Sequence, residues 1–184
     1  MNQPPDRTVL DACVLFPSVL REILLDVAEG GGLTPLWSAR ILAEWQLAAA
    51  RHGPDVAAIA QATIVALRAQ WPDAQIDAMP EIEARLALPD SADRHVLATA
   101  IAGGAGLIVT QNLRDFPPRA LGPEGVIARS PDDFLMDQWL AHPAQVEAAV
   151  ARAVANTEAA SGRAQPVRAL LKRARLPRLG KALS

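Results

Sequence analysis

The chain has 184 residues, of which 51% are hydrophobic and 21% charged, so it is long enough for one domain with a substantial core and is not intrinsically disordered. Its single cysteine, Cys13, cannot form an internal disulfide, and no apolar run is long enough to span a membrane. The first residues, MNQPPDRT, lack the pattern of a secretory signal. Together these features predict a cytoplasmic protein.

The formal net charge of −2 conceals an uneven distribution of charged residues along the chain. Glu158 is the last acidic residue, and seven basic residues follow it. Residues 1–162 therefore carry 11 basic and 20 acidic residues, a balance of −9. An acidic body followed by a basic tail is an asymmetry that a functional interpretation has to explain.

Short apolar runs alternate with helical patterns along most of the chain. Two positions carry strong start signals for a helix, because Ser38 and Ser130 are good N-caps and Pro131 suits the first helical turn. The segment between residues 70 and 91, with Pro80 and Pro89, is predicted to be a loop or an edge strand. Strands are predicted at 8–10, 33–37, 106–110 and 126–128, and helices at 19–29, 38–53, 54–70, 91–102, 130–140, 143–161 and 167–176.

This alternation of strands and helices predicts an α/β fold, with a mostly parallel central sheet that is covered by helices on both faces. Residues 1–142 are predicted to form this domain, and residues 143–184 a basic helical extension. No Gly-x-Gly-x-x-Gly motif follows the first strand, which argues against a dinucleotide-binding enzyme.

Acidic side chains occur where the segments of such a fold would meet. Asp11 follows the first strand, Asp115 follows the strand 106–110, and Glu44 lies within an otherwise apolar helix. Each has an ordinary explanation when taken alone, because strand-end aspartates often cap turns and Glu44 could pair with Arg40. Ligands of parallel α/β folds, however, bind beyond the carboxyl ends of the strands, where one site could collect all of these acids.

The helix that precedes the strand 106–110 opens with two further acids, Asp90 and Asp93, in the stretch DSADRHVLATA. A cluster of carboxylates without a cation would be self-repelling and would raise its own pKa values. A hard divalent cation such as Mg²⁺ or Mn²⁺ would relieve that repulsion, because carboxylate oxygens are its preferred ligands. His52 and His142 have no partners at ligand spacing, so a zinc site is not expected.

The stretches VLDACVL, SARILAEW and DSADRHVLATAIAGGAGLIVTQNLRDF resemble the motif islands of PIN-domain ribonucleases, which include the VapC-type toxins of bacterial toxin–antitoxin modules. The resemblance covers roughly residues 8–140. It implies a PIN-like three-layer sandwich and a cytoplasmic endoribonuclease that depends on Mg²⁺ or Mn²⁺. It also implies an RNA substrate and a cognate antitoxin protein, and it leaves a homodimer open.

The resemblance also assigns roles to individual residues. Thr110 and Asn112 match the polar positions that order metal-bound water. Many family members have an acid where Asn112 stands, so a second metal is expected to be weakly held or absent. Either Asp90 or Asp93 could supply the third carboxylate, and we prefer Asp93 because it keeps the spacing to the LATA segment, with Asp90 as a helper. The metal-binding and catalytic acids are then Asp11, Glu44, Asp93 and Asp115.

Two alternatives to a metal-dependent nuclease remain open at this point. A haloacid-dehalogenase-like phosphatase would use Asp11 as a covalent nucleophile, but such enzymes favour Asp-x-Asp and this chain has Cys13 at the second position. The other alternative is a non-catalytic PIN-like module that binds RNA or protein. The four intact acids argue against such a module, and metal titration would distinguish it from a nuclease.

Several other residues receive ordinary structural interpretations. Cys13 is predicted to be a small buried hydrophobe, and His95 a surface or hydrogen-bonded histidine rather than a general base. The four tryptophans are expected in the core and at interfaces. The basic tail could bind RNA phosphate, dock on the acidic body of a neighbouring subunit or form a solvated helix.

Overall fold

The computed structural model describes residues 7–184, and its centre is a five-stranded sheet with the order β3-β2-β1-β4-β5. Every strand pair in this sheet is parallel, so the predicted α/β class with a parallel sheet is confirmed. Residues 1–6 lie outside the described residues. They belong to the predicted domain and to the segment that was compared with a secretory signal. The strands are β1 (Arg7–Leu10), β2 (Thr34–Ser38), β3 (Gln75–Ile76), β4 (Leu107–Val109) and β5 (Ile127–Arg129).

The two central strands, β1 and β4, form the most deeply buried part of the sheet. Val9 and Leu10 of β1 and Ile108 and Val109 of β4 are all fully buried. Val9 pairs with Ile108, and Leu10 with Val109, so the two strands end side by side. Strands buried on both faces read as continuous apolar runs, which is why the sequence pattern identified them.

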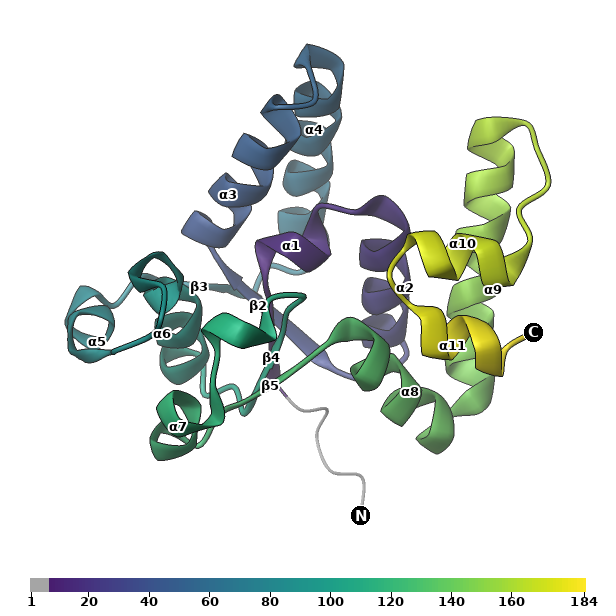
Figure 1. Cartoon of the computed structure of the whole chain (residues 1–184). Coiled ribbons are helices and arrows are strands. Elements are labelled where there is room, and N and C mark those ends of the chain that lie inside the picture. Colours follow the sequence, from purple (N-terminus) through teal and green to yellow (C-terminus); the bar gives the residue numbers. More distant parts are fainter. Residues whose placement is uncertain (1–6) are drawn as a thin grey trace.

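Helices cover the sheet and extend beyond its carboxyl edge. Figure 1 shows α6 and α2 on different sides of the sheet, while α3 and α4 project together past the strand ends. The two helix caps predicted from the sequence are confirmed. The Ser38 side chain accepts from the Ile41 amide at the start of α3, and the Ser130 side chain accepts from the Asp133 amide at the start of the helix Pro131–Ala141. The helices of this part are α1 (Ala12–Leu15), α2 (Ser18–Glu29), α3 (Ala39–Ala50), α4 (Pro54–Gln70), α5 (Pro80–Arg85), α6 (Arg94–Ala102) and α7 (Pro118–Leu121), with the 3₁₀ turns η1 (Ser91–Asp93), η2 (Leu113–Asp115) and η3 (Gly122–Glu124).

Four short helices in the structure were not predicted. α1 follows β1 directly because the Asp11 carboxylate caps it, with Oδ1 accepting from the Ala12 amide at 2.7 Å. The segment that was predicted as a loop or an edge strand contains both the short strand β3 and the helix α5. α5 begins at Pro80 and has Glu81 and Glu83 in its first turn. The others are α7 and the last helix of the chain, each of which also starts at a proline. One or two turns are too short to show the periodicity on which the predictions relied.

The C-terminal segment packs on the rest of the chain through buried apolar side chains. It consists of α8 (Pro131–Ala141), α9 (Pro143–Ser161), α10 (Val167–Arg173) and α11 (Pro177–Ala182). α9 packs along α2, where Arg152 Nε lies 2.7 Å from Asp26 Oδ2 and the Gln145 side chain donates to the Val27 carbonyl. The buried faces of α10 and α11 include Leu171 and Leu179, whereas all seven basic side chains of the tail are exposed.

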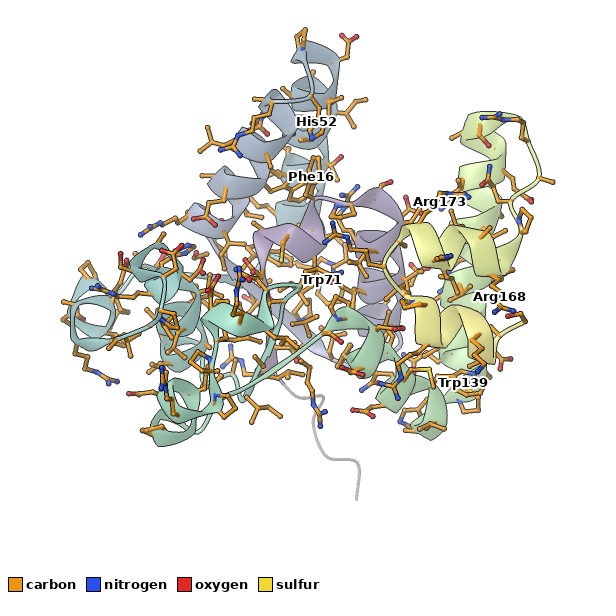
Figure 2. The ribbon with its side chains drawn as sticks, viewed as in Figure 1. Phe16, His52, Trp71, Trp139, Arg168 and Arg173 are labelled. Atoms are coloured by element: carbon orange, nitrogen blue, oxygen red, sulfur yellow. The ribbon has the colours of Figure 1, made fainter. Side chains whose placement is uncertain are left out.

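The tryptophans lie largely in the hydrophobic core, as expected from the sequence. Trp37 and Trp45 are 0% and 2% exposed, and Trp71 is partly buried against the same core. Trp139 joins α8 to α9, since its Nε1 donates to Glu147 Oε1 at 3.0 Å (Figure 2). Within residues 7–184, no helix combines the length and the apolar character that crossing a membrane requires.

Candidate functional site

Asp11 and Thr110 form the fixed centre of the site at the carboxyl edge of the sheet. Each is the first residue after a central strand, and the register of β1 and β4 brings the two together. Thr110 Oγ1 donates to Asp11 Oδ2 at 2.7 Å, and the Asp11 amide donates to the Val109 carbonyl. Both side chains are buried, with Asp11 8% exposed and Thr110 0%. The hydroxyl therefore holds the carboxylate in one orientation.

Cys13 is part of the same hydrogen-bonded group and is more than a small apolar residue. Its Sγ donates to Asp11 Oδ2 at 3.2 Å, lies 3.5 Å from Thr110 Oγ1 and accepts from the Gln111 amide at 3.3 Å. Burial, and then the charge of Asp11, raise the pKa of the thiol to about 12. The thiol therefore stays protonated at neutral pH and orients Asp11 rather than acting as a nucleophile. Its position two residues after Asp11 was the signal available in the sequence.

Asp93 lies at the electrostatic centre of the acids. Burial raises its pKa to about 6, and the charges of other carboxylates add to the shift in the order Asp11, Asp90, Asp115 and Glu44. The Asp93 carboxylate forms no hydrogen bond or ion pair with any residue of the described range 7–184. The other four predicted acids thus all raise the pKa of the Asp93 carboxylate, which lacks a cationic partner within the described residues.

Asp90 and Asp93 have different surroundings even though they are three residues apart. Asp90 is exposed, and its Oδ1 accepts from the Ala92 amide at 2.8 Å, so it caps η1. Asp93 is only partly exposed, and the charges of Asp11 after β1, Glu44 on α3 and Asp115 in η2 raise its pKa. The preference for Asp93 as the third acid, with Asp90 as a helper, stays a prediction.

Asn112 and Asp115 approach the site from the loop that follows β4. The Asn112 amide nitrogen donates to Thr110 Oγ1 at 3.0 Å, which ties the loop to the fixed centre. The Asn112 side chain donates to Asp115 Oδ2. η2 then turns the chain so that Asp115 faces Asp93 closely enough to influence its pKa.

Glu44 lies on α3 between the acids and two basic side chains. Its Oε1 lies 2.8 Å from Nε2 of His95, although the two groups are poorly aligned for a hydrogen bond. The pairing with Arg40 that the sequence allowed is loose, at 3.8 Å, and Arg40 is 3.0 Å from Glu83. His95 is 5% exposed, and within residues 7–184 neither of its ring nitrogens has a hydrogen-bond partner, so it is a buried neighbour of Glu44 and not the surface or hydrogen-bonded histidine that was predicted.

The donor set fits a hard divalent cation by its chemistry. It offers carboxylate oxygens and a threonine hydroxyl, which Mg²⁺ and Mn²⁺ prefer over nitrogen or sulfur ligands. Within residues 7–184, no three His, Cys, Asp or Glu side chains are arranged closely enough to hold a metal ion as they stand. Binding would therefore require the partly exposed side chains of Glu44 and Asp115 to move toward Asp93, while Asp11 is already held in place by Thr110.

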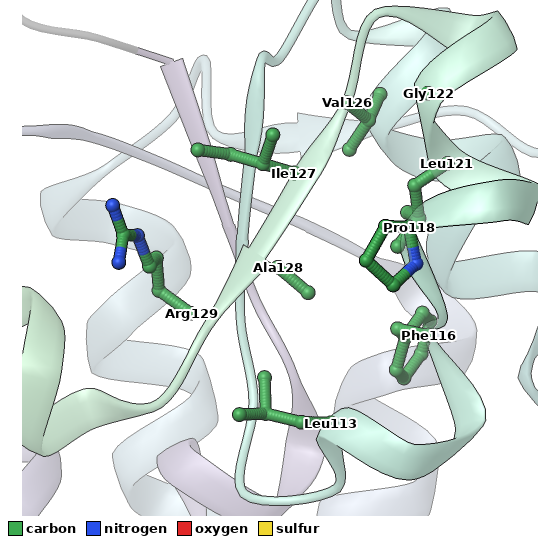
Figure 3. A pocket seen from close by; sticks show the side chains of 9 residues that line it. All are labelled: Leu113, Phe116, Pro118, Leu121, Gly122, Val126, Ile127, Ala128 and Arg129. Carbon is green, nitrogen blue, oxygen red and sulfur yellow. The ribbon is translucent and has the colours of Figure 1, made fainter.

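The apolar pocket beside the acids is a separate feature. It has a volume of about 450 Å³ and lies between β5 and the segment from η2 to η3 (Figure 3). Leu113, which belongs to the same turn as Asp115, lines it together with Phe116 and Ala128. None of the predicted acids lines this pocket, so it is not the candidate site.

The comparison with protein families agrees with the fold. The family model described as a PIN domain matches residues 7–114, which is more than half of the chain. The chain therefore belongs to the PIN-domain family, as the sequence motifs predicted. Asp11, Glu44 and Asp93 lie within the matched range, and Asp115 follows its last residue directly.

One segment of the chain also matches a VapC-type protein. Over 46 residues it is 56% identical to "Putative ribonuclease VapC50" of Mycobacterium tuberculosis (strain ATCC 25618 / H37Rv). The match covers 25% of this chain and 27% of that protein, so the chain spans about a quarter of the length of this curated relative. No solved structure matches the chain significantly.

Proposed function

We propose that this protein is a metal-dependent endoribonuclease and the toxin component of a toxin–antitoxin pair. The observation that carries the proposal is the unpaired Asp93 carboxylate, whose pKa is raised by burial and by the charges of Asp11, Asp90, Asp115 and Glu44. Carboxylates gathered at one sheet edge repel one another and destabilise the fold unless a cation offsets their charge. Membership of the PIN-domain family and the ribonuclease name of the relative support the same activity.

In this proposal Asp11, Glu44, Asp93 and Asp115 would hold Mg²⁺ or Mn²⁺, with Asp90 as an outer helper. When bound, the ion supplies a water molecule of lowered pKa and neutralises charge on the phosphate. Thr110 and Cys13 keep Asp11 oriented through their contacts with Oδ2. The Asn112 side chain orients Asp115 and is available to order water at the site.

The partner and the substrate class follow from the family rather than from the geometry. A VapC-type nuclease acts on RNA and is inhibited by a cognate antitoxin, which would cover the acidic site. A homodimer stays a prediction. A gene for a small DNA-binding protein next to this one would support the toxin assignment.

RNA cleavage should require Mg²⁺ or Mn²⁺ and should stop when EDTA is added. Asp11→Asn should lower the cleavage rate by more than the roughly 10- to 100-fold that is typical when a residue behind a metal ligand is removed, because Asp11 is itself a ligand. The measurement is cleavage of a labelled RNA of mixed sequence, with circular dichroism to show that the variant is folded. Cleavage that survives EDTA, or a wild-type rate in Asp11→Asn, would refute the mechanism.

Two controls sharpen this experiment. Asp137→Asn changes an exposed acid on α8 and should leave the rate unchanged. Asp90→Asn should be milder than Asp93→Asn, and the reverse order would mean that Asp90 is the third ligand. If the protein binds the metal ion and RNA without cleaving, the non-catalytic alternative holds instead.

A further inference from the structure

A groove of about 430 Å³ adjoins the acidic site on the side of Cys13. Cys13 and Gln111 line it together with Arg173, the last residue of α10, and Arg175 of the turn that follows. Cys13 Sγ is 3.2 Å from Asp11 Oδ2, so the groove begins one side chain away from the fixed centre of the site. It therefore connects the proposed metal centre with the basic tail.

The floor of this groove is apolar and contains an aromatic ring. Phe16 lines it, and its ring stacks on that of His52, with centroids 5.4 Å apart and an interplanar angle of 25°. Arg21 holds the end of α1 in place, since its guanidinium donates to the carbonyls of Leu15 and Phe16. Figure 2 shows Phe16 above the sheet and Arg173 at the end of α10 that faces α2.

Both arginines keep donors free for a ligand. Arg173 Nη2 donates to Gln165 Oε1 at 2.5 Å, which leaves its other N–H groups available. Arg175 has no hydrogen bond or ion pair from its side chain within residues 7–184. Both side chains are exposed, and none of the acids of the site lines the groove beside them.

Arg175 also occupies a backbone position that favours glycine. Its φ is 60°, and it is the one non-glycine residue with positive φ in the described range 7–184. The Arg175 amide donates to the Lys172 carbonyl and the Leu176 amide to the Leu171 carbonyl, which is the Schellman arrangement that ends a helix. Glycine adopts this conformation without the steric cost that arginine incurs. This turn places the Arg175 guanidinium at the groove despite the steric cost of its backbone conformation.

We propose that this groove binds the phosphate backbone of the RNA strand next to the bond that is cut. The inference rests on the proposed nuclease function, because it concerns the path of the strand as it leaves the metal centre. A single strand presents one anionic phosphate and one planar base per nucleotide, and the groove offers arginines on its wall and an apolar, aromatic floor. The two arginines also offset part of the repulsion that the acidic body exerts on RNA.

The test measures binding of a short fluorescent single-stranded RNA at several salt concentrations in Asp11→Asn protein with Mg²⁺. Each phosphate that a cationic side chain neutralises on a single strand contributes about 0.7 to the slope of log K against log salt, so Arg173→Gln with Arg175→Gln should lower the slope by about 1.4. The matched control is Arg163→Gln with Arg168→Gln, which removes the same charge from the tail but from residues outside the groove. Its slope should stay the same.

A second variant separates a binding role from a structural one. Arg175→Gly should raise the melting temperature, by about 2 °C or more, because it removes the cost of the left-handed conformation. The same substitution should weaken RNA binding, a combination that a purely structural arginine would not produce.

Three results would overturn the proposal. The first is an equal decrease of the salt slope in the groove variant and the control variant, and the second is an unchanged slope in both. The third is a groove variant that binds polyglutamate more weakly than the parent protein does but binds RNA equally well, which would assign the groove to an acidic protein. The binding slopes can be read whether or not the wild-type protein cleaves RNA. Absence of cleavage would therefore refute the nuclease function without deciding the role of the groove.

Discussion

The Asp93 carboxylate is partly buried beside other acids, and this environment links the chemistry of the site to the stability of the protein. Its pKa is raised to about 6 from an ordinary value of 3.8, chiefly by burial and then by the charge of Asp11. The folded protein therefore holds this proton over a pH range in which the unfolded chain has already released it. By linkage, the metal-free protein becomes less stable as pH rises through that range.

Asp93→Asn should make the metal-free protein more stable at pH 7 and should have little effect near pH 4. Because the Asp93 carboxylate is only partly buried, the gain should be on the order of 1 kcal/mol, below the value that the full pKa shift implies. Urea denaturation in EDTA at several pH values measures this difference.

Asp90→Asn is the matched control, since Asp90 is exposed and asparagine also caps a helical turn. It should change stability little at either pH. Added Mg²⁺ should reverse the order of wild type and Asp93→Asn, because only the wild type gains the full binding free energy of the ion. A variant that is less stable than wild type in EDTA at pH 7 would contradict the electrostatic account.

Among the elements, α11 is held on α8 partly by a buried carboxylate, beside the ion pair of Arg178 with Asp133. Asp132 Oδ2 accepts from the Arg178 amide at 2.9 Å and Oδ1 accepts from the Leu179 amide at 3.1 Å. Asp132 is 7% exposed and lies in the first turn of α8, where a negative charge is favoured by the helix dipole. The same side chain thus satisfies the free amides of one helix and the dipole of another.

Asp132→Ala should lower the free energy of unfolding by about 1–3 kcal/mol, because it leaves two amides at this helix contact without acceptors. Urea denaturation measures the decrease, and hydrogen exchange should be faster at the amides of residues 178 and 179. Asp137→Ala, at an exposed position of the same helix, is the control and should change little. Equal stability of the two variants would show that Asp132 does not hold α11 in place.

For the whole molecule, the basic tail packs on its own chain and does not extend freely into solvent. Leu170, Leu171, Leu176 and Leu179 are each at most 3% exposed, and α10 packs on α11 and α9. The tail was expected to bind RNA, to dock on a neighbouring subunit or to be solvated. In the structure its apolar stripe is buried within the chain and its basic side chains are exposed, although Arg178 pairs with Asp133 and Arg173 donates to Gln165.

Deletion of residues 163–184 should lower the melting temperature, since each buried leucine contributes roughly 1.5–3 kcal/mol. Thermal denaturation measures this change, and light scattering shows whether the exposed faces of α8 and α9 associate. The increase in melting temperature on adding Mg²⁺ should persist in the truncated protein, because the acids lie on other elements. An unchanged melting temperature without Mg²⁺ would contradict the packing of the tail.

The sequence by itself determined the parallel α/β fold, the family and the acids that gather at the sheet edge. Apolar runs identified β1 and β4, and because parallel strands end at one edge, Asp11 and Asp115 were expected on the same side. These features depend on local patterns and on one general property of parallel sheets.

Only the tertiary structure decided which side chains contact one another across long stretches of chain. The contact of Cys13 with Thr110, the approach of His95 to Glu44 and the groove beside Arg175 all depend on how helices and loops pack. α1 and α11 are likewise set by capping carboxylates and by burial rather than by periodicity. Local sequence determines the conformation of a segment, whereas the angle and register at which two segments pack are determined by the side chains of both.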